Sequence, residues 1–297
     1  MRCIQAEKPL RLLCFFFTNA FAGAPQLNQE LSVKALLTAS AVVFVALLAT
    51  ISGPRRLAAA PRHKSPRANG ESGCPAGAED MLNWFTMAPD LRDDHHLEGT
   101  NNPMYTTVLP PDDDGLGKFI WTKSKKGYPW DVKLYDDHNI YIWLTESSWT
   151  DAHTYKAFAN KRALALSPRC VSLDSPDPKG TAQISDTTFQ VHSSCKDYVT
   201  KNLKKAITHL YGPRPMNFGG DLPADLPTMM ASYQYICDSS YRNCRDKEEF
   251  YLAKPYGIVE WRHYKLQGDD YELVKTTTFN RVVKGQTKPV LPCVEKD

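Results

Sequence analysis

Residues 104–149, MYTTVLPPDDDGLGKFIWTKSKKGYPWDVKLYDDHNIYIWLTESSW, decide the fold class of this chain. Runs rich in β-branched and aromatic residues alternate there with turn sequences of Pro, Gly and Asp, such as PPDDDGLG and DDH. Within DVKLY and NIYIWL apolar and polar residues alternate, which is typical of half-buried strands. The stretch therefore predicts a series of short strands joined by tight turns, with residues 136–138 as one of the turns.

The same pattern continues towards the C-terminus. We expect further strands at 183–192 and 231–237, and hairpins over 249–283. Two helices are predicted as well, a short one near 78–87 and a longer one over 198–211. The longer helix follows from apolar residues at helical spacing, with Gly and Pro directly after them; these apolar residues are Val199, Leu203, Ala206, Ile207 and Leu210. The chain is thus predicted to be mainly β, an antiparallel sandwich or jelly-roll-like domain with one or two short helices.

A hydrophobic leader precedes this domain. Residues 35–51, ALLTASAVVFVALLATI, are apolar or small throughout and would span about 25 Å as a helix, less than a bilayer core of about 30 Å. We therefore interpret residues 1–52 as a signal peptide, and translation from Leu31 would give a leader of ordinary length. Five Lys and Arg follow the apolar run, which keeps open an anchored form in which residues 35–51 are retained. Residues 53–73 are expected to be a disordered tether, and residues 74–297 a single domain.

The cysteines indicate an oxidising compartment. Two of the eight lie in the leader, and no CxxC spacing suggests zinc or redox chemistry among the others. Behind an export signal the expectation is three disulfides, for which 15 pairings exist. Cys237 and Cys244 flank a short polar loop and are the pair we predict. The six cysteines expected to be in disulfides are Cys74, Cys170, Cys195, Cys237, Cys244 and Cys293. We expect an extracellular or periplasmic location.

Charge argues against nucleic acid as a partner. The net charge of +3 hides a segregation, because residues 1–68 hold nine Lys and Arg against two Glu. Residues 69–297 therefore hold 27 basic and 31 acidic residues, and no basic stripe for a phosphate backbone is evident. No membrane partner is expected unless residues 35–51 remain as an anchor.

Two acidic stretches could suggest a metal. Residues 93–96 read Asp-Asp-His-His, but neighbours in an extended chain point to opposite faces, so we interpret them as a solvated loop. Residues 110–115 carry three Asp but lack the spacing of a calcium loop, so a turn is the better interpretation. We predict no metal and no cofactor.

An aromatic band over residues 121–149 is the strongest indication of a ligand. Flat aromatic faces stack on sugar rings, and lysines interspersed in the band could bind hydroxyls. Such aromatics could instead fill the core of a sheet. Trp130 and Trp149 are the predicted exposed contacts, whereas Trp143 lies mid-strand and is the likeliest core residue. The predicted ligand-binding residues are Trp130, Trp149, Trp121 and Tyr128.

For catalysis, Gln190-Val191-His192 followed later by Tyr264-Lys265 and Gly268 resembles two of the three signature segments of jelly-roll alginate lyases. The resemblance implies β-elimination beside a uronate, with His192 and Tyr264 as base and acid and Gln190 beside them. The Arg-rich signature strand of that family is missing here, and the Tyr segment departs from its spacing.

Three functions stay open from the sequence. The leading one is an exported β-rich binding domain with an extracellular glycan as ligand. The alternatives are a polysaccharide lyase, and a structural or interaction module without a small-molecule site. Whether the protein is an enzyme is left undecided.

Overall fold

The structure, a computed structural model, describes residues 73–100, 102–146, 155–158, 161–172, 181–185, 188–194, 197–202 and 205–290. The predicted leader and almost all of the predicted tether lie outside these residues, as do Trp149, Cys195 and Cys293. Within the described ranges, no helix has both the length and the apolar character needed to cross a bilayer.

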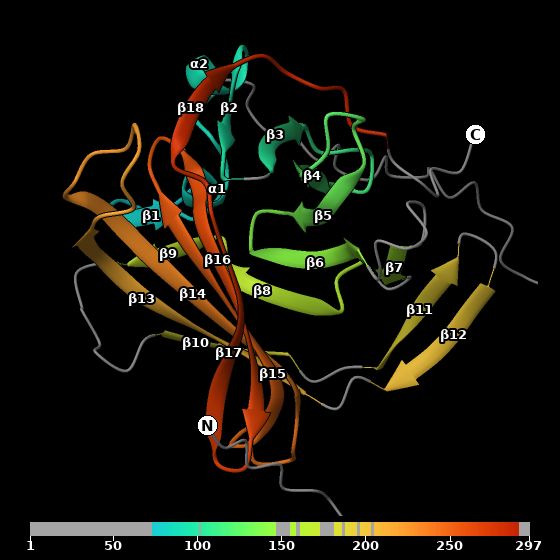
Figure 1. The fold of residues 1–297 in the computed structure, drawn as a ribbon. Coiled ribbons are helices and arrows are strands. Elements are labelled where there is room, and N and C mark those ends of the chain that lie inside the picture. Colours follow the sequence, from blue (N-terminus) through green and yellow to red (C-terminus); the bar gives the residue numbers. More distant parts are fainter. Residues whose placement is uncertain are drawn as a thin grey trace, which may run out of the picture. The chain divides into compact units, whose positions relative to one another are not determined.

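The described chain is mainly β and antiparallel, as predicted (Figure 1). One sheet has six strands, most of them long. In spatial order these are β10 (Thr181–Ser185), β13 (Ala206–Met216), β14 (Leu226–Cys237), β15 (Cys244–Ala253), β16 (Gly257–Gln267) and β17 (Asp270–Thr278).

The second sheet has ten strands and includes the aromatic band. Along its main path lie β12 (Asp197–Asn202), β11 (Thr188–Ser194), β7 (Tyr155–Phe158), β6 (Asn139–Glu146), β5 (Pro129–Tyr135), β4 (Gly117–Thr122), β3 (Pro103–Leu109), β2 (His95–Glu98) and β18 (Arg281–Lys284). Strand β8 (Leu164–Pro168) pairs with β6 off this path, and β1 (Ala78–Asp80) pairs separately with β9 (Cys170–Ser172). The two helices are α1 (Leu82–Phe85) and α2 (Pro89–Arg92).

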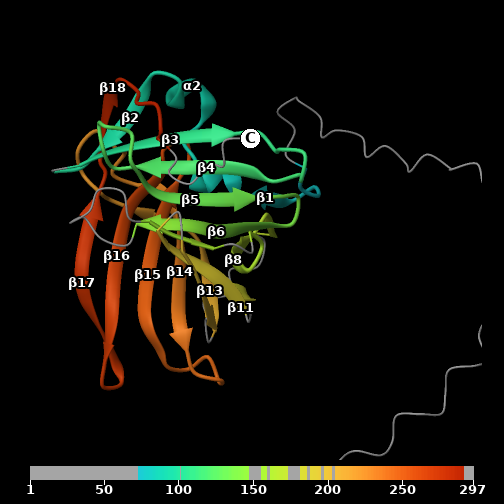
Figure 2. The same ribbon diagram turned by 90° about the vertical axis from the view of Figure 1, so that its right-hand side faces the viewer.

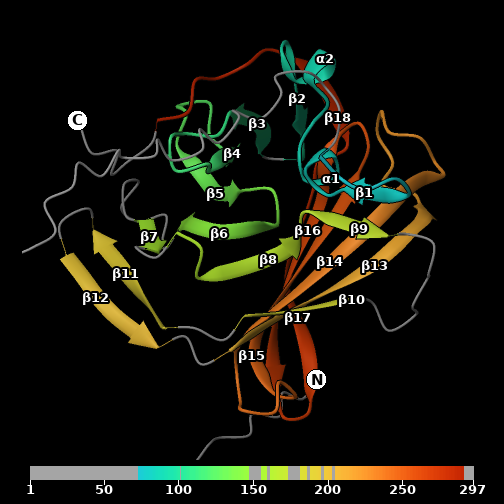
Figure 3. The same cartoon turned by 180° about the vertical axis from the view of Figure 1, so that it is seen from behind.

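The strands of the two sheets run across each other. In Figure 2, β3 to β6 cross the view from side to side, whereas β14 to β17 run from top to bottom, as in orthogonally packed sheets. Figure 3 shows β8 and β10 close together from behind, and the Ser185 hydroxyl donates to the Ala165 carbonyl there (3.0 Å). On the other side, the Asn280 N–H donates to the Glu98 carbonyl just before β18 (3.1 Å). The sheets are therefore linked at both sides.

Large aromatic side chains fill the space between the sheets. The rings of Trp121 on β4 and Phe250 on β15 lie 5.7 Å apart, and Phe85 of α1 lies 6.1 Å from Trp121. The indole N–H of Trp121 donates to the Phe85 carbonyl (3.2 Å). Because its polar atom is satisfied by the backbone, Trp121 can be wholly buried without penalty.

The predicted helix over 198–211 is wrong, because this region contributes to β12 and β13. Ala206 and Leu210 are four residues apart, a spacing that one helix face and one strand face share. In β13 both face inwards, while Ile207 faces the other way and packs against Cys237 and Cys244. Pairing with β10 and β14 on both sides thus overrides the helical pattern.

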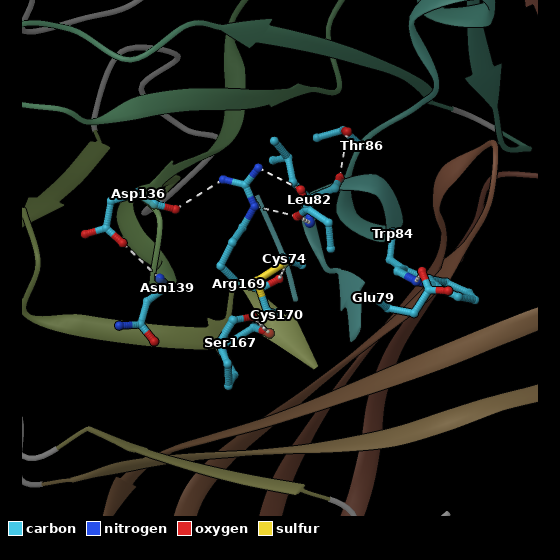
Figure 4. Close-up of polar contacts among 12 residues, drawn as sticks. Cys74, Glu79, Leu82, Trp84, Thr86, Asp136, Asn139, Ser167, Arg169 and Cys170 are labelled. Atoms are coloured by element: carbon cyan, nitrogen blue, oxygen red, sulfur yellow. Dashed lines mark hydrogen bonds and ion pairs between the residues drawn. A yellow bond between two sulfur atoms is a disulfide. The ribbon is translucent and has the colours of Figure 1, made fainter. Parts of the chain in front are cut away.

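The segment after Cys74 is linked to β9 and to Arg169, the residue just before it, by a disulfide and an ion pair (Figure 4). The disulfide Cys74–Cys170 has a Cα–Cα distance of 5.4 Å. The Arg169 guanidinium forms an ion pair with Asp80 and donates to the Asp136 carbonyl (3.1 Å). Of the short helix predicted near 78–87, Leu82–Phe85 is helical as α1, whereas Ala78–Asp80 pairs with β9 as strand β1.

Acidic residues organise the turns that the sequence predicted. The Asp112 carboxylate accepts the N–H groups of Asp114 (3.1 Å) and Leu116 (3.0 Å), and this turn joins β3 to β4. The Asp136 carboxylate likewise accepts the N–H groups of His138 and Asn139 in the turn between β5 and β6. The interpretation of residues 93–96 as a loop is only half right, because β2 begins at His95 and the ring of His96 stacks inside on Tyr105.

The predicted disulfide Cys237–Cys244 is confirmed. The two cysteines lie opposite each other on β14 and β15 and close the loop between these strands. Within the loop, the Asp238 carboxylate accepts N–H groups of Ser240 (2.9 Å) and Arg242 (3.2 Å).

Candidate functional site

A β-bulge determines the position of Trp130. Trp121 pairs with Asp131 and Thr122 with Pro129, so Trp130 is an extra residue on β5. Bulges redirect side chains and are common beside functional sites. The Trp130 ring lies 5.9 Å from that of Trp121 and meets Trp261 of the other sheet edge-on at 5.3 Å. The bulge therefore directs Trp130 into the space between the sheets.

A lysine of the chain lies on these rings. The Lys123 ammonium is 3.2 Å from the ring centroid of Trp130 and 4.8 Å from that of Trp261. Lys123 is buried, so water screens this cation–π attraction little. The Trp130 ring is thus engaged by the protein's own residues.

A polar row lies opposite, on the inner face of the six-stranded sheet. Thr208, Tyr233, Glu248 and His263 occupy directly opposed positions on the successive strands β13, β14, β15 and β16. Directly opposed residues share a face of a sheet. The next row on this face is part of the core and consists of Leu210, Ala231, Phe250 and Trp261.

Glu248 is the carboxylate of this row, and its side chain is partly buried. Its carboxylate accepts one hydrogen bond on each oxygen, from the Tyr235 hydroxyl (3.2 Å) and from the Trp261 indole N–H (3.2 Å). A carboxylate can accept about four. Burial raises the pKa of Glu248, and the nearby Asp131 carboxylate adds to the rise, against the influence of Lys133. Burial also raises the pKa of Tyr235, which keeps its proton to donate.

Asp131 and Lys133 enter the same space from β5. Lys133 is 1% exposed, and its ammonium lies 2.7 Å from the Asp131 carboxylate. The ammonium is also 5.3 Å from the Trp121 ring and 5.5 Å from the Phe250 ring. Burial raises the pKa of Asp131 although Lys133 opposes it.

Asp246, at the next inward position along β15, completes the group together with His263 of the row. The Asp246 carboxylate accepts from Arg245 (2.8 Å) and lies 3.3 Å from the His263 ring nitrogen. Tyr233 and Tyr235 stack on each other at 5.2 Å. We call the whole group the inner polar cluster, which consists of Lys123, Trp130, Asp131, Lys133, Thr208, Tyr233, Tyr235, Asp246, Glu248, Trp261 and His263.

Glu249, the next residue along the chain, shows by contrast how unusual Glu248 is. Glu249 faces the opposite side of the sheet and accepts from Lys247 (3.0 Å), Tyr251 (2.9 Å) and Tyr264 (2.8 Å). Burial acts to raise the pKa of Glu249, but the hydrogen bonds from Lys247 and Tyr264 lower it below its usual value. Two adjacent carboxylates thus have pKa values shifted in opposite directions by their surroundings.

The residues of the lyase resemblance lie on different sheets. Gln190 and His192 are on β11 of the ten-stranded sheet. Tyr264 is on β16, and its hydroxyl is held by Glu249 on the face opposite to Glu248. No strand pairing among the described residues joins β16 to β11.

The predicted ligand-binding residues differ in position. Trp121, predicted to bind a ligand, is 0% exposed and offers no exposed face, because α1 and Phe250 cover it. Trp130 is partly buried and turned inwards by its bulge, and Tyr128 is partly exposed. Trp143 was predicted to be core but is itself an unpaired bulge residue, half-buried against clusters on the other face of its sheet.

Sequence reasoning missed the acidic members of the cluster. Asp246, Glu248 and Phe250 alternate along β15, which would have shown two carboxylates on the same face as a core aromatic. No group of three or more His, Cys, Asp or Glu in the described ranges is arranged to hold a metal ion. Comparison with protein-family models, curated proteins and solved structures finds no match.

Proposed function

We propose that this protein is an exported binding domain that holds a small polar ligand at the inner polar cluster. The observation that carries the proposal is Glu248, a carboxylate with unused hydrogen-bonding capacity among aromatic rings at the sheet interface. An incompletely satisfied charge there reduces stability, and such groups are concentrated at ligand sites. Aromatic walls with a few polar groups are the usual composition of a small-molecule site.

The ligand site is proposed between the sheets and not on an exposed row of indoles. Trp121 is buried, and Trp130 is in contact with Trp121, Lys123 and Trp261. A saccharide, the ligand class suggested by the aromatic band, could still donate hydroxyls to Glu248. Saccharides are therefore the first class to test at this cluster.

Export is proposed on two grounds. The disulfides Cys74–Cys170 and Cys237–Cys244 are typical of an oxidising compartment. The apolar run over residues 35–51 supplies the expected export signal.

The test is a thermal-unfolding screen of the secreted full-chain protein against saccharides and small organic ions. A ligand at about 100 times its Kd should raise Tm by about 5–10 °C. The shift should be lost in Glu248→Gln, which keeps the shape of the side chain and removes its charge. Glu272→Gln is the matched control, because Glu272 is an exposed carboxylate on β17.

If no probe of either class shifts Tm, the structural-module alternative replaces the proposal. If uronate-containing polysaccharides gain unsaturated-product absorbance when incubated with the protein, the lyase alternative replaces it. A shift that persists in Glu248→Gln would place the ligand elsewhere.

A further inference from the structure

One carboxylate of the inner polar cluster, that of Glu248, lacks a direct ion-pair partner among the described residues, although Lys123 and Lys133 lie in the same cluster. Five carboxylates are buried in the described part of the chain, and each has a cationic partner: Asp80 with Arg169, Asp131 with Lys133, Asp246 with Arg245, Glu249 with Lys247 and Glu260 with Arg262. Glu248, which is partly buried, has none within ion-pair distance in that part, and its two donors are neutral.

The walls around Glu248 suit an organic cation. Trp261 donates to the carboxylate through its ring N–H, so the edge of its indole lies beside Glu248, while its ring faces Lys123 and His263. Tyr235 donates from the other oxygen and stacks on Tyr233. Electron-rich ring faces attract ammonium groups, and the position of Lys123 over Trp130 and Trp261 shows that these rings accept one.

A second observation points to a ligand on the same face. Thr208 is 0% exposed, and its hydroxyl oxygen has no hydrogen-bond partner among the described residues. It lies in the polar row of Glu248, two strands away, which is about 10 Å across the sheet. A buried hydroxyl without a partner destabilises the fold, and a ligand donor would remove this deficit.

From these observations we infer that the inner polar cluster binds a small organic ammonium ion, with the Glu248 carboxylate as its counter-ion. The inference rests on the proposed function, because it takes this cluster as the ligand site. Aromatic rings and one carboxylate would hold the ammonium, and Thr208 supplies a further hydrogen-bonding position.

The experiment titrates the secreted full-chain protein with choline, with ethanolamine and with 3,3-dimethyl-1-butanol, the uncharged analogue of choline. Calorimetry at pH 7 should show binding of one or both ammonium ions and weaker binding of the neutral alcohol. Loss of the counter-charge, and with ethanolamine also of the hydrogen bond from its ammonium, should weaken the ammonium complex about ten- to a hundred-fold in Glu248→Gln. Glu272→Gln should bind like the wild type.

A measurement on the wild type alone tests the inference even if the Glu248→Gln variant does not fold. Choline affinity should rise with pH as Glu248 loses its proton, because a neutral carboxyl offers no counter-charge. Equal affinity for choline and its neutral analogue, or a Glu248→Gln variant that binds choline normally, would overturn the inference.

The two proposals fail in different ways. Saccharides that bind in a Glu248-dependent manner, with no ammonium binding, would leave the proposed function in place and overturn the ligand class. Absence of binding for every saccharide and ammonium probe would overturn both.

Discussion

Replacing Lys133 with Met tests whether the charged groups between the sheets depend on one another for their pKa values and for the stability of the fold. Lys133 is 1% exposed, pairs with Asp131 at 2.7 Å and is the cation that most opposes the rise in the pKa of Glu248. Met preserves most of the apolar stem, so the ring contacts with Trp121 and Phe250 should largely survive. The variant therefore removes the positive charge of Lys133 while keeping most of the apolar contacts of its side chain.

The expected loss of stability at pH 7 is about 3–5 kcal/mol, the usual effect of removing one partner of a buried ion pair. Without Lys133 the folded-state pKa of Asp131, already raised by burial, rises further. A carboxyl with a raised folded-state pKa contributes stability that is fully present below its unfolded pKa, about 3.9 for Asp, and lost as the pH rises through the folded value. The loss should therefore be greatest near pH 7 and shrink towards pH 4.

Urea unfolding of wild type and variant between pH 4 and pH 7 measures this directly. The double variant Asp131→Leu/Lys133→Met is the control, since replacing both members of a buried pair by apolar groups is often neutral. It should recover most of the stability lost in the single variant. A loss below about 1 kcal/mol, or a loss independent of pH, would refute the reasoning.

Three further predictions follow from the packing. Replacing both cysteines of Cys237–Cys244 by Ser should lower the free energy of unfolding by about 2–3 kcal/mol, as expected for a seven-residue separation. The same change at Cys74–Cys170, separated by 96 residues, should lower it by about 4–5 kcal/mol, so denaturant titration should rank the second bridge higher. Trp121→Ala should lose about 3–5 kcal/mol because the side chain is wholly buried, and a loss under 1 kcal/mol would contradict its place in the core.

The strands were predictable where the signal is local. Residues 104–146 alternate and are separated by Asp- and Gly-containing turns, so β3 to β6 follow from the sequence. The Cys237–Cys244 bridge is equally local, because the loop between them is short. Residues 198–211 failed because neighbouring strands that lie far away in the sequence decide their conformation.

The candidate site was harder to predict from the sequence than the strands were. Alternation in DVKLY would place Val132 and Leu134 towards the core and Asp131 and Lys133 towards water. In the structure β5 is buried on both faces, with Val132 and Leu134 in separate clusters on the far side. The bulge that redirects Trp130 depends on pairing with β4 and has no signature in the sequence.

The most direct test of the proposed ammonium site is a comparison of two Kd values for choline at pH 7. The ratio needed is the Kd of Glu248→Gln divided by that of the wild type. Trp130 and Trp261 lie in the cluster, so their fluorescence should change on binding and report the Kd. The account predicts a saturable change in the wild type and a Kd about ten-fold or more higher in the variant. A ratio near one, or no saturable change in the wild type, would contradict it.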